Sequence, residues 1–223
     1  MEETRSAVEK ETVMAESEAQ EKETIREEGP KTQKTYARRK KKPPGNVDWF
    51  GICNGRHLLL KSFGIARVTA IVMFLPSIIW DEGYFLFLGD FNSQQVPFYK
   101  LAHQAGREGK LGWNWYTVLG SNFMGSYSFY LLGSPFFWLT IPFPNDWVPY
   151  LMGPLLMLKY ATMSMTATAW LRRYVKHGEF AVLGGLLYAF SGYTMYNTFF
   201  NHFLDVMVFF PLMLIGMDEL VEN

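Results

Sequence analysis

The sequence predicts an all-α, polytopic membrane protein with about four transmembrane helices and one large outer loop that carries membrane-surface helices. The chain consists of two unlike parts. Residues 1–42 hold 11 basic and 10 acidic side chains and a single aromatic, Tyr36, whereas the remainder is about 12% charged and about 20% aromatic. That remainder contains apolar stretches near the length of about 20 residues that a helix needs to cross a bilayer. Basic clusters beside two of these stretches indicate their orientation.

The first part, residues 1–57, is expected to be a charged, mostly disordered cytoplasmic tail, because it has too few apolar side chains to offset the entropy of ordering. This part contains a basic run, residues 38–42, ahead of the first apolar stretch. This run has two interpretations, a nucleic-acid contact or a topology signal beside a membrane span. No nucleic-acid-binding motif accompanies it, so we expect the topology signal and no nucleic-acid partner.

Several classes of protein are excluded by composition. Cys53 is the sole cysteine and the four histidines are scattered, so neither a disulfide framework nor a zinc site is expected. The first thirty residues lack the apolar core of a signal peptide, and no nucleotide-binding fingerprint or nucleophile elbow is present. We therefore assign no metal ligand, and any transferase here is expected to use a lipid-linked donor.

The second part, residues 58–223, is predicted to be the membrane domain. Its first span ends at Trp80, an aromatic suited to the interface. The expected spans lie near residues 63–80, 148–171, 180–197 and 203–219, and the outer loop covers residues 81–147. This topology places the protein in the cell membrane, as a multi-pass protein with a cytoplasmic N-terminus.

A five-span alternative remains, because the uncharged stretch 127–143 could also cross. If it did, the cluster Arg172, Arg173 and Lys176 would lie outside, against the positive-inside rule. Glycines and prolines also interrupt the stretch. We therefore favour four spans, with residues 127–143 at the outer interface or in a re-entrant segment.

Asp90 is the candidate for chemistry in the outer loop. It follows an apolar stretch and Gly89, so its carboxylate could lie partly desolvated at the membrane surface, where a base is useful. The alternative is an Asp that caps the helix expected to start near Asn92.

Residues 94–110 read as an amphipathic helix, with Val96, Tyr99, Ala102 and His103 on one side, of the kind that lies on a membrane. Lys100 and Arg107 lie on its other sides. They are either solvated surface charges or cations that neutralise a lipid phosphate.

Lys159 lies near the middle of its span, where a charge costs at least about 2.5 kcal/mol, so it is expected to face the bundle interior or a polar cavity. Asp205, at the outer end of the fourth span, is its candidate partner. Asp205 could also be merely interfacial.

Ordered motifs along the chain carry a family resemblance. They are Gly89 to Tyr99 (GDFNSQQVPFY), Gly120 to Gly125, Ser134 to Phe136, Leu158-Lys159 with Leu171 to Arg173, Leu187 to Gly192, and Leu204-Asp205 with Pro211-Leu212. In order and spacing they resemble the N-terminal part of the bacterial YfhO membrane protein family, over about residues 60–220.

The resemblance implies a GT-C type glycosyltransferase, which takes a sugar from a polyprenyl-phosphate carrier on the outer face. In Gram-positive bacteria the family is associated with glycosylation of teichoic acids, so the acceptor would be a cell-envelope polymer. Some GT-C enzymes use a divalent cation, which stays an open alternative. Family members continue through further spans, so the chain is expected to be a fragment of the complete enzyme.

Position by position, Asp90 matches the essential acid of the family and would act as the base, with inversion at the sugar. Gln94, Asn122, Lys159 and Asp205 match motif positions and are expected to shape the substrate site. Lys100 or Arg107 is expected, from charge alone, to stabilise the leaving phosphate.

The competing hypothesis is a non-catalytic polytopic membrane protein, either a transporter or an envelope-assembly subunit. In that case Lys159 and Asp205 are its essential polar groups and Asp90 is dispensable.

Overall fold

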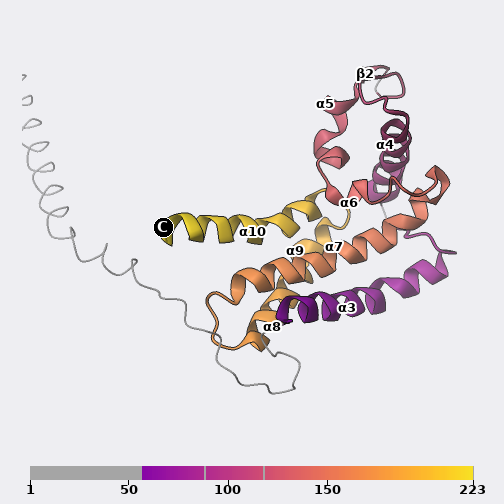
Figure 1. Cartoon of the computed structure of the whole chain (residues 1–223). Helices are drawn as coiled ribbons and strands as arrows, with labels where there is room; N and C mark the ends of the chain where they lie inside the picture. The colour runs from indigo at the N-terminus through magenta and orange to yellow at the C-terminus, as the bar shows by residue number, and fades with distance from the viewer. Residues whose placement is uncertain (1–56, 88, 118, 223) are drawn as a thin grey trace, which may run out of the picture. The chain divides into compact units, whose positions relative to one another are not determined.

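Helices account for most of the chain over the residues that the computed structural model describes, 57–87, 89–117 and 119–222 (Figure 1). The longer helices are α3 (Leu58–Trp80), α4 (Val96–Glu108), α7 (Val148–Leu171), α8 (Gly178–Ala189) and α10 (Phe203–Glu222). The shorter ones are η1 (Phe91–Gln95), α5 (Phe123–Tyr127), η2 (Ser128–Leu132), α6 (Pro135–Trp138), η3 (Asn145–Trp147) and α9 (Gly192–Asn197). A mostly helical chain agrees with the all-α prediction. The tail predicted for residues 1–57 lies, except for His57, outside the described residues.

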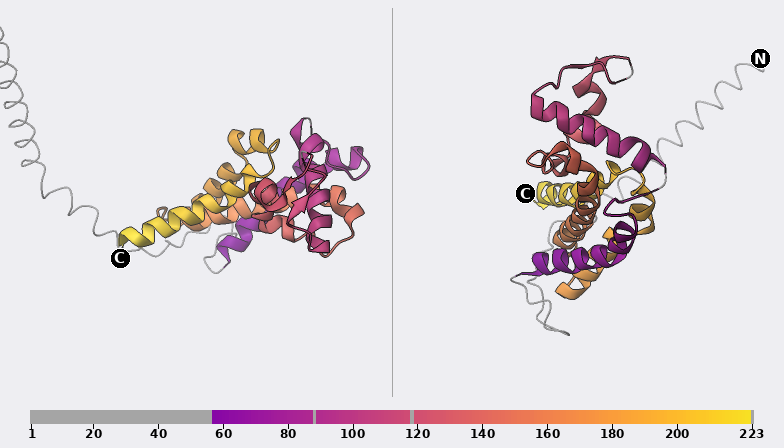
Figure 2. Two further views of the ribbon diagram at one scale, coloured as in Figure 1. Left: turned by 90° about the horizontal axis from the view of Figure 1, so that it is seen from above. Right: turned by 90° about the vertical axis from the view of Figure 1, so that its right-hand side faces the viewer.

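Helices α3, α7 and α8 pack against one another and lie side by side in the different views (Figures 1 and 2). Small side chains allow their backbones to approach closely. Ala66 and Ala70 of α3 are fully buried, and Gly185 of α8 lies against Thr168 of α7. The hydroxyl of Ser62 hydrogen-bonds that of Thr168 at 2.7 Å, which links α3 to α7. The bundle is thus held by close packing together with hydrogen bonds between helices.

Helix α3 has the length and composition of a membrane span. It contains 23 residues and is, among the described residues, the one helix long and apolar enough to cross a bilayer on those criteria. Its outward side exposes apolar side chains such as Val72 and Ile79, about 70% exposed each. These features support association with a membrane, while the number of spans remains a prediction.

The predicted third span, residues 180–197, is two helices in the structure. Helix α8 ends at Ala189, and α9 begins at Gly192 after a turn. The turn forms because Ser191 caps α9, its hydroxyl accepting a hydrogen bond from the backbone N–H of Thr194. At 1.5 Å per residue, the 12 residues of α8 extend only about 18 Å, less than the hydrocarbon thickness of about 30 Å.

The segment from 81 to 147 is built from short helices and turns between α3 and α7. We call it the outer segment. Residues 127–143, all described, form no continuous helix, because Pro135, Gly133 and Pro142 interrupt it and divide it among α5, η2 and α6. The expected amphipathic helix is present as η1 followed by α4, and its residues Tyr99, Ala102 and His103 are buried.

Helix α10 runs parallel to α7. Near its start Asp205 contacts Lys159, and near its end Asp218 accepts a hydrogen bond from the indole of Trp170 at 3.2 Å. The start of α10 therefore lies level with the middle of α7, about 16 Å along the helix from Val148. The outer segment contacts the turn between α9 and α10 here, through Gln95 with His202 and Tyr99 with Asn201. These contacts position the candidate site.

Candidate functional site

Asp90 lies on a turn that is anchored by aromatic side chains. Phe85 and Phe91 on either side of it are buried, with ring centroids 5.1 Å apart in an edge-to-face contact. Gly89 has a φ of +78°, and a Cβ built there would lie 2.0 Å from Cζ of Phe199. Only glycine fits this close approach without strain. The turn thus fixes Asp90 against the segment that joins α9 and α10.

The carboxylate of Asp90 is half-buried and accepts a hydrogen bond from Nε2 of Gln94 at 3.2 Å. It makes no capping hydrogen bond to η1, so the structure does not support the capping alternative. Asn92 supports the backbone instead, since its Oδ1 accepts from the N–H of Phe87 at 2.7 Å. Because this hydrogen bond from one neutral amide occupies a single lone pair, the other lone pairs of the carboxylate remain able to accept a proton from a substrate.

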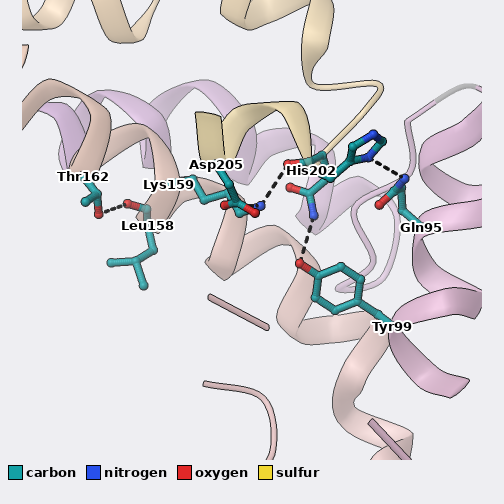
Figure 3. A network of polar contacts seen from close by, with 8 residues as sticks. Gln95, Tyr99, Leu158, Lys159, Thr162, His202 and Asp205 are labelled. Carbon is teal, nitrogen blue, oxygen red and sulfur yellow. Dashed lines mark hydrogen bonds and ion pairs between the residues drawn. The ribbon is translucent and has the colours of Figure 1, made fainter. Parts of the chain in front are cut away.

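Lys159 and Asp205 form the pair that the sequence suggested (Figure 3). Lys159 is fully buried, and its Nζ lies 2.9 Å from Oδ1 of Asp205 and 2.9 Å from the carbonyl oxygen of Asn201, to which it donates a hydrogen bond. The ring of Phe136 lies 5.5 Å from the same nitrogen. The ammonium is thus stabilised by a carboxylate, a carbonyl and an aromatic face.

The same network extends into the outer segment. Nδ2 of Asn201 donates to the hydroxyl of Tyr99 in α4 at 3.3 Å. Burial, and then the negative charge of Asp205, raise the pKa of the Tyr99 phenol, so it stays neutral while its oxygen accepts from Asn201. The pair Lys159–Asp205 is therefore connected to α4 through Asn201.

A second contact, between Gln95 and His202, joins η1 to the α9–α10 turn (Figure 3). Nε2 of Gln95 lies 3.2 Å from Nδ1 of His202, which accepts and so carries its proton on Nε2. Burial, and then the charge of Lys159, lower the pKa of His202. Oε1 of Gln95 is buried without a hydrogen-bond partner among the described residues. Sequence reasoning missed both residues, although Gln95 adjoins Gln94.

The structure brings together two pairs of predicted residues, Asp90 with Gln94 and Lys159 with Asp205. No hydrogen bond or ion pair among the described residues joins one pair directly to the other. The link is indirect, because Gln94 and Gln95 are consecutive in η1 and Gln95 contacts His202 beside the second pair.

The other predicted residues have local contacts. Asn122 is exposed and caps α5, its Oδ1 accepting from the N–H of Gly125 at 2.9 Å. Lys100 pairs with the exposed carboxylate of Asp146 at 3.5 Å, and Nη1 of Arg107 donates to the carbonyl of Phe143 at 3.0 Å. Both cations are exposed in the outer segment. Their role toward a phosphate stays a prediction.

The described part of the chain contains no group of three or more His, Cys, Asp or Glu side chains that could hold a metal ion. We therefore assign no residue to a divalent cation.

An apolar helix of spanning length and a lysine–aspartate pair buried between helices are typical of a helical membrane protein. Residues 62–223 match the family described as bacterial membrane protein YfhO, so the chain belongs to that family. The resemblance drawn from the motifs is thereby confirmed. The comparison with curated proteins and the comparison with solved structures each found no match.

Proposed function

We propose that this chain forms part of a membrane glycosyltransferase that moves a sugar from a polyprenyl-phosphate carrier to a cell-envelope polymer, such as teichoic acid, on the outer face. Family membership supports a glycosyltransferase-like membrane protein. The observation that supports the site is the placement of Asp90. Its carboxylate makes no capping hydrogen bond, and the turn on which it lies is fixed by aromatic packing.

In the proposed reaction Asp90 accepts the proton of the acceptor hydroxyl as its oxygen attacks the anomeric carbon. The bond from that carbon to the phosphate oxygen breaks, and the polyprenyl phosphate leaves with the bonding electrons. Attack opposite the leaving group inverts the configuration. Gln94 orients the carboxylate, and Lys100 or Arg107 stabilises the leaving phosphate.

The test of this proposal is Asp90→Asn in the full-length protein. We expect sugar transfer to fall at least about 100-fold, because the amide cannot take the proton, while insertion and melting temperature stay unchanged. Glu82→Gln is the matched control, since Glu82 is an exposed acid of the same outer segment, and it should retain transfer. Wild-type transfer by Asp90→Asn would exclude Asp90 as the base.

The proposed topology puts the outer segment outside the cell and the basic residues after α7 in the cytoplasm. Two positions test it in a Cys53→Ser background. Tyr116 is 88% exposed in the outer segment, and Lys176 is exposed after α7. We expect an impermeant thiol reagent to label Tyr116→Cys on intact cells and Lys176→Cys only after permeabilisation. The reverse pattern would contradict a reaction on the outer face.

The second candidate is a non-catalytic transporter or assembly subunit. The observation that favours it is the buried pair Lys159–Asp205, because ionisable residues inside membrane proteins often mark transport paths. The Asp90→Asn assay separates the two candidates, since only the transferase requires that carboxylate.

A further inference from the structure

Two tryptophans of the outer segment are exposed yet held in a fixed arrangement. Trp113 is 59% exposed and Trp115 is 73% exposed, and their ring centroids lie 5.6 Å apart in an edge-to-face contact. Trp113 is in β1 (Trp113–Asn114), which pairs with β2 (Ser121–Asn122) in an antiparallel register. The two indoles therefore form a preformed aromatic surface.

Gly120 makes this arrangement possible. A Cβ built on it would lie 2.9 Å from Cε3 of Trp115 and 3.0 Å from Cζ2 of Trp113, and its φ is +113°. Both rings thus lie over the bare backbone of one glycine, in a conformation that other residues rarely adopt. Any side chain at Gly120 would displace them.

A groove of about 550 Å³ lies between this aromatic surface and α4. Besides the indoles, its polar lining consists of Gln104, Glu108, Lys110, Asn114 and Tyr116. Nε2 of Gln104 donates to Oε1 of Glu108 at 3.0 Å, and Nζ of Lys110 lies 2.9 Å from Oε2 of Glu108. These contacts orient the side chains and leave donors and acceptors free for a ligand.

From this combination we infer that the groove binds carbohydrate, one or two pyranose units of a glycan chain, at a place separate from Asp90. The C–H face of a pyranose packs on an indole, and its hydroxyls pair with planar amide and carboxylate groups such as those of Gln104 and Glu108. Insertion of this groove into lipid together with the hairpin that β1 and β2 form is disfavoured, because the ion pair Glu108–Lys110 in the groove lining would have to leave water.

The inference goes beyond the proposed reaction, because binding at the groove does not require Asp90 to be catalytic. Binding can be measured without any transfer. The variant Asp90→Asn should bind the same oligosaccharide as the wild type, so failure of the base assignment and failure of the groove assignment give different results.

The experiment uses the full chain in a detergent without a sugar headgroup. Tetrasaccharides of glucose, of galactose and of N-acetylglucosamine are titrated, and binding is followed by saturation-transfer NMR and calorimetry. We expect at least one to bind, Trp115→Ala to weaken it at least about tenfold, and Gly120→Ala to weaken it through displacement of the rings. The control Trp147→Ala removes another exposed tryptophan of the outer segment and should leave binding unchanged.

Absence of binding by all three tetrasaccharides, or binding unchanged in Trp115→Ala with a native circular dichroism spectrum, would overturn the inference.

A third measurement addresses lipid directly. Leu119, in the turn between β1 and β2, is 96% exposed, so Leu119→Cys in a Cys53→Ser background, labelled with a polarity-sensitive fluorophore, should show emission typical of water in vesicles. Emission typical of an apolar environment would identify a lipid-inserted hairpin and also overturn it.

Discussion

The buried ion pair of the helix bundle and the exposed cations of the outer segment have opposite surroundings. In the bundle, Lys159 and Asp205 face each other inside, and Ser62 binds hydroxyls on α7. In the outer segment, Lys100 and Arg107 lie at the surface. Polar groups that pair inside hold a scaffold together, whereas these exposed cations have solvent-exposed contacts, to Asp146 and to the carbonyl of Phe143, that a ligand can replace. Substitutions in the bundle should therefore mainly change stability, and those in the outer segment mainly function.

The largest expected effect is at Lys159. Lys159→Met leaves the carboxylate of Asp205 without its cation in a site where its side chain is only 15% exposed. We expect a loss of about 3–5 kcal/mol in the free energy of unfolding, measured by denaturation in detergent, because an uncompensated charge is left largely buried.

Two controls test the explanation. The double variant Lys159→Met with Asp205→Leu removes both charges and should recover much of the loss. Lys100→Met breaks an exposed ion pair and should change stability by no more than about 1 kcal/mol. Equal losses in the single and double variants would show that the pair is not the cause.

The second effect concerns the contact between the two regions at Gly89. Gly89→Ala places a methyl 2.0 Å from Cζ of Phe199 at a φ of +78°. We expect the free energy of unfolding, measured in the same denaturation assay, to fall by about 2 kcal/mol. About 1–2 kcal/mol of this comes from the backbone conformation.

The matched control is Gly64→Ala in α3, where a Cβ meets no atom within 4 Å. That variant should be neutral or stabilising by up to about 1 kcal/mol, because alanine favours helix. Adding Phe199→Ala to Gly89→Ala should remove the clash but leave the backbone strain. Wild-type stability of Gly89→Ala would show that the turn does not depend on this contact.

The sequence predicted those features that depend on local pattern. The amphipathic helix over residues 94–110 and the burial of Lys159 follow from periodicity and from the cost of a charge in a span. The contact of Gln95 with His202 joins residues about a hundred positions apart, and no local pattern indicates it. The break in residues 180–197 could have been found, since a serine followed by a glycine inside an apolar stretch is a capping signal.

A smaller effect is expected inside the bundle at Ser62. Ser62→Ala removes hydrogen bonds to Ser164 at 2.9 Å and Thr168 at 2.7 Å. Such hydrogen bonds between membrane helices contribute about 0.6 kcal/mol on average, so we expect the free energy of unfolding to fall by that order. Thr69→Ala is the control, because its hydroxyl bonds only the carbonyl of Ile65 in its own helix, and it should be near neutral. A loss above about 2 kcal/mol would indicate a repacked interface instead.

The smallest expected effect is a pH dependence where the two regions meet, at His202. Its pKa is lowered from 6.5 by burial and then by the charge of Lys159, against an opposite contribution from Asp205. As pH falls below 6.5, the unfolded chain takes up a proton on this imidazole that the folded chain does not. Folding stability should therefore fall as the pH decreases from 6.5 toward the lower folded pKa, and this contribution should be constant at pH values well above 6.5. His202→Gln should lose less stability than the wild type between about pH 7.5 and about pH 5.5, measured as the shift in melting temperature. Equal shifts would mean that folding does not lower the pKa of His202.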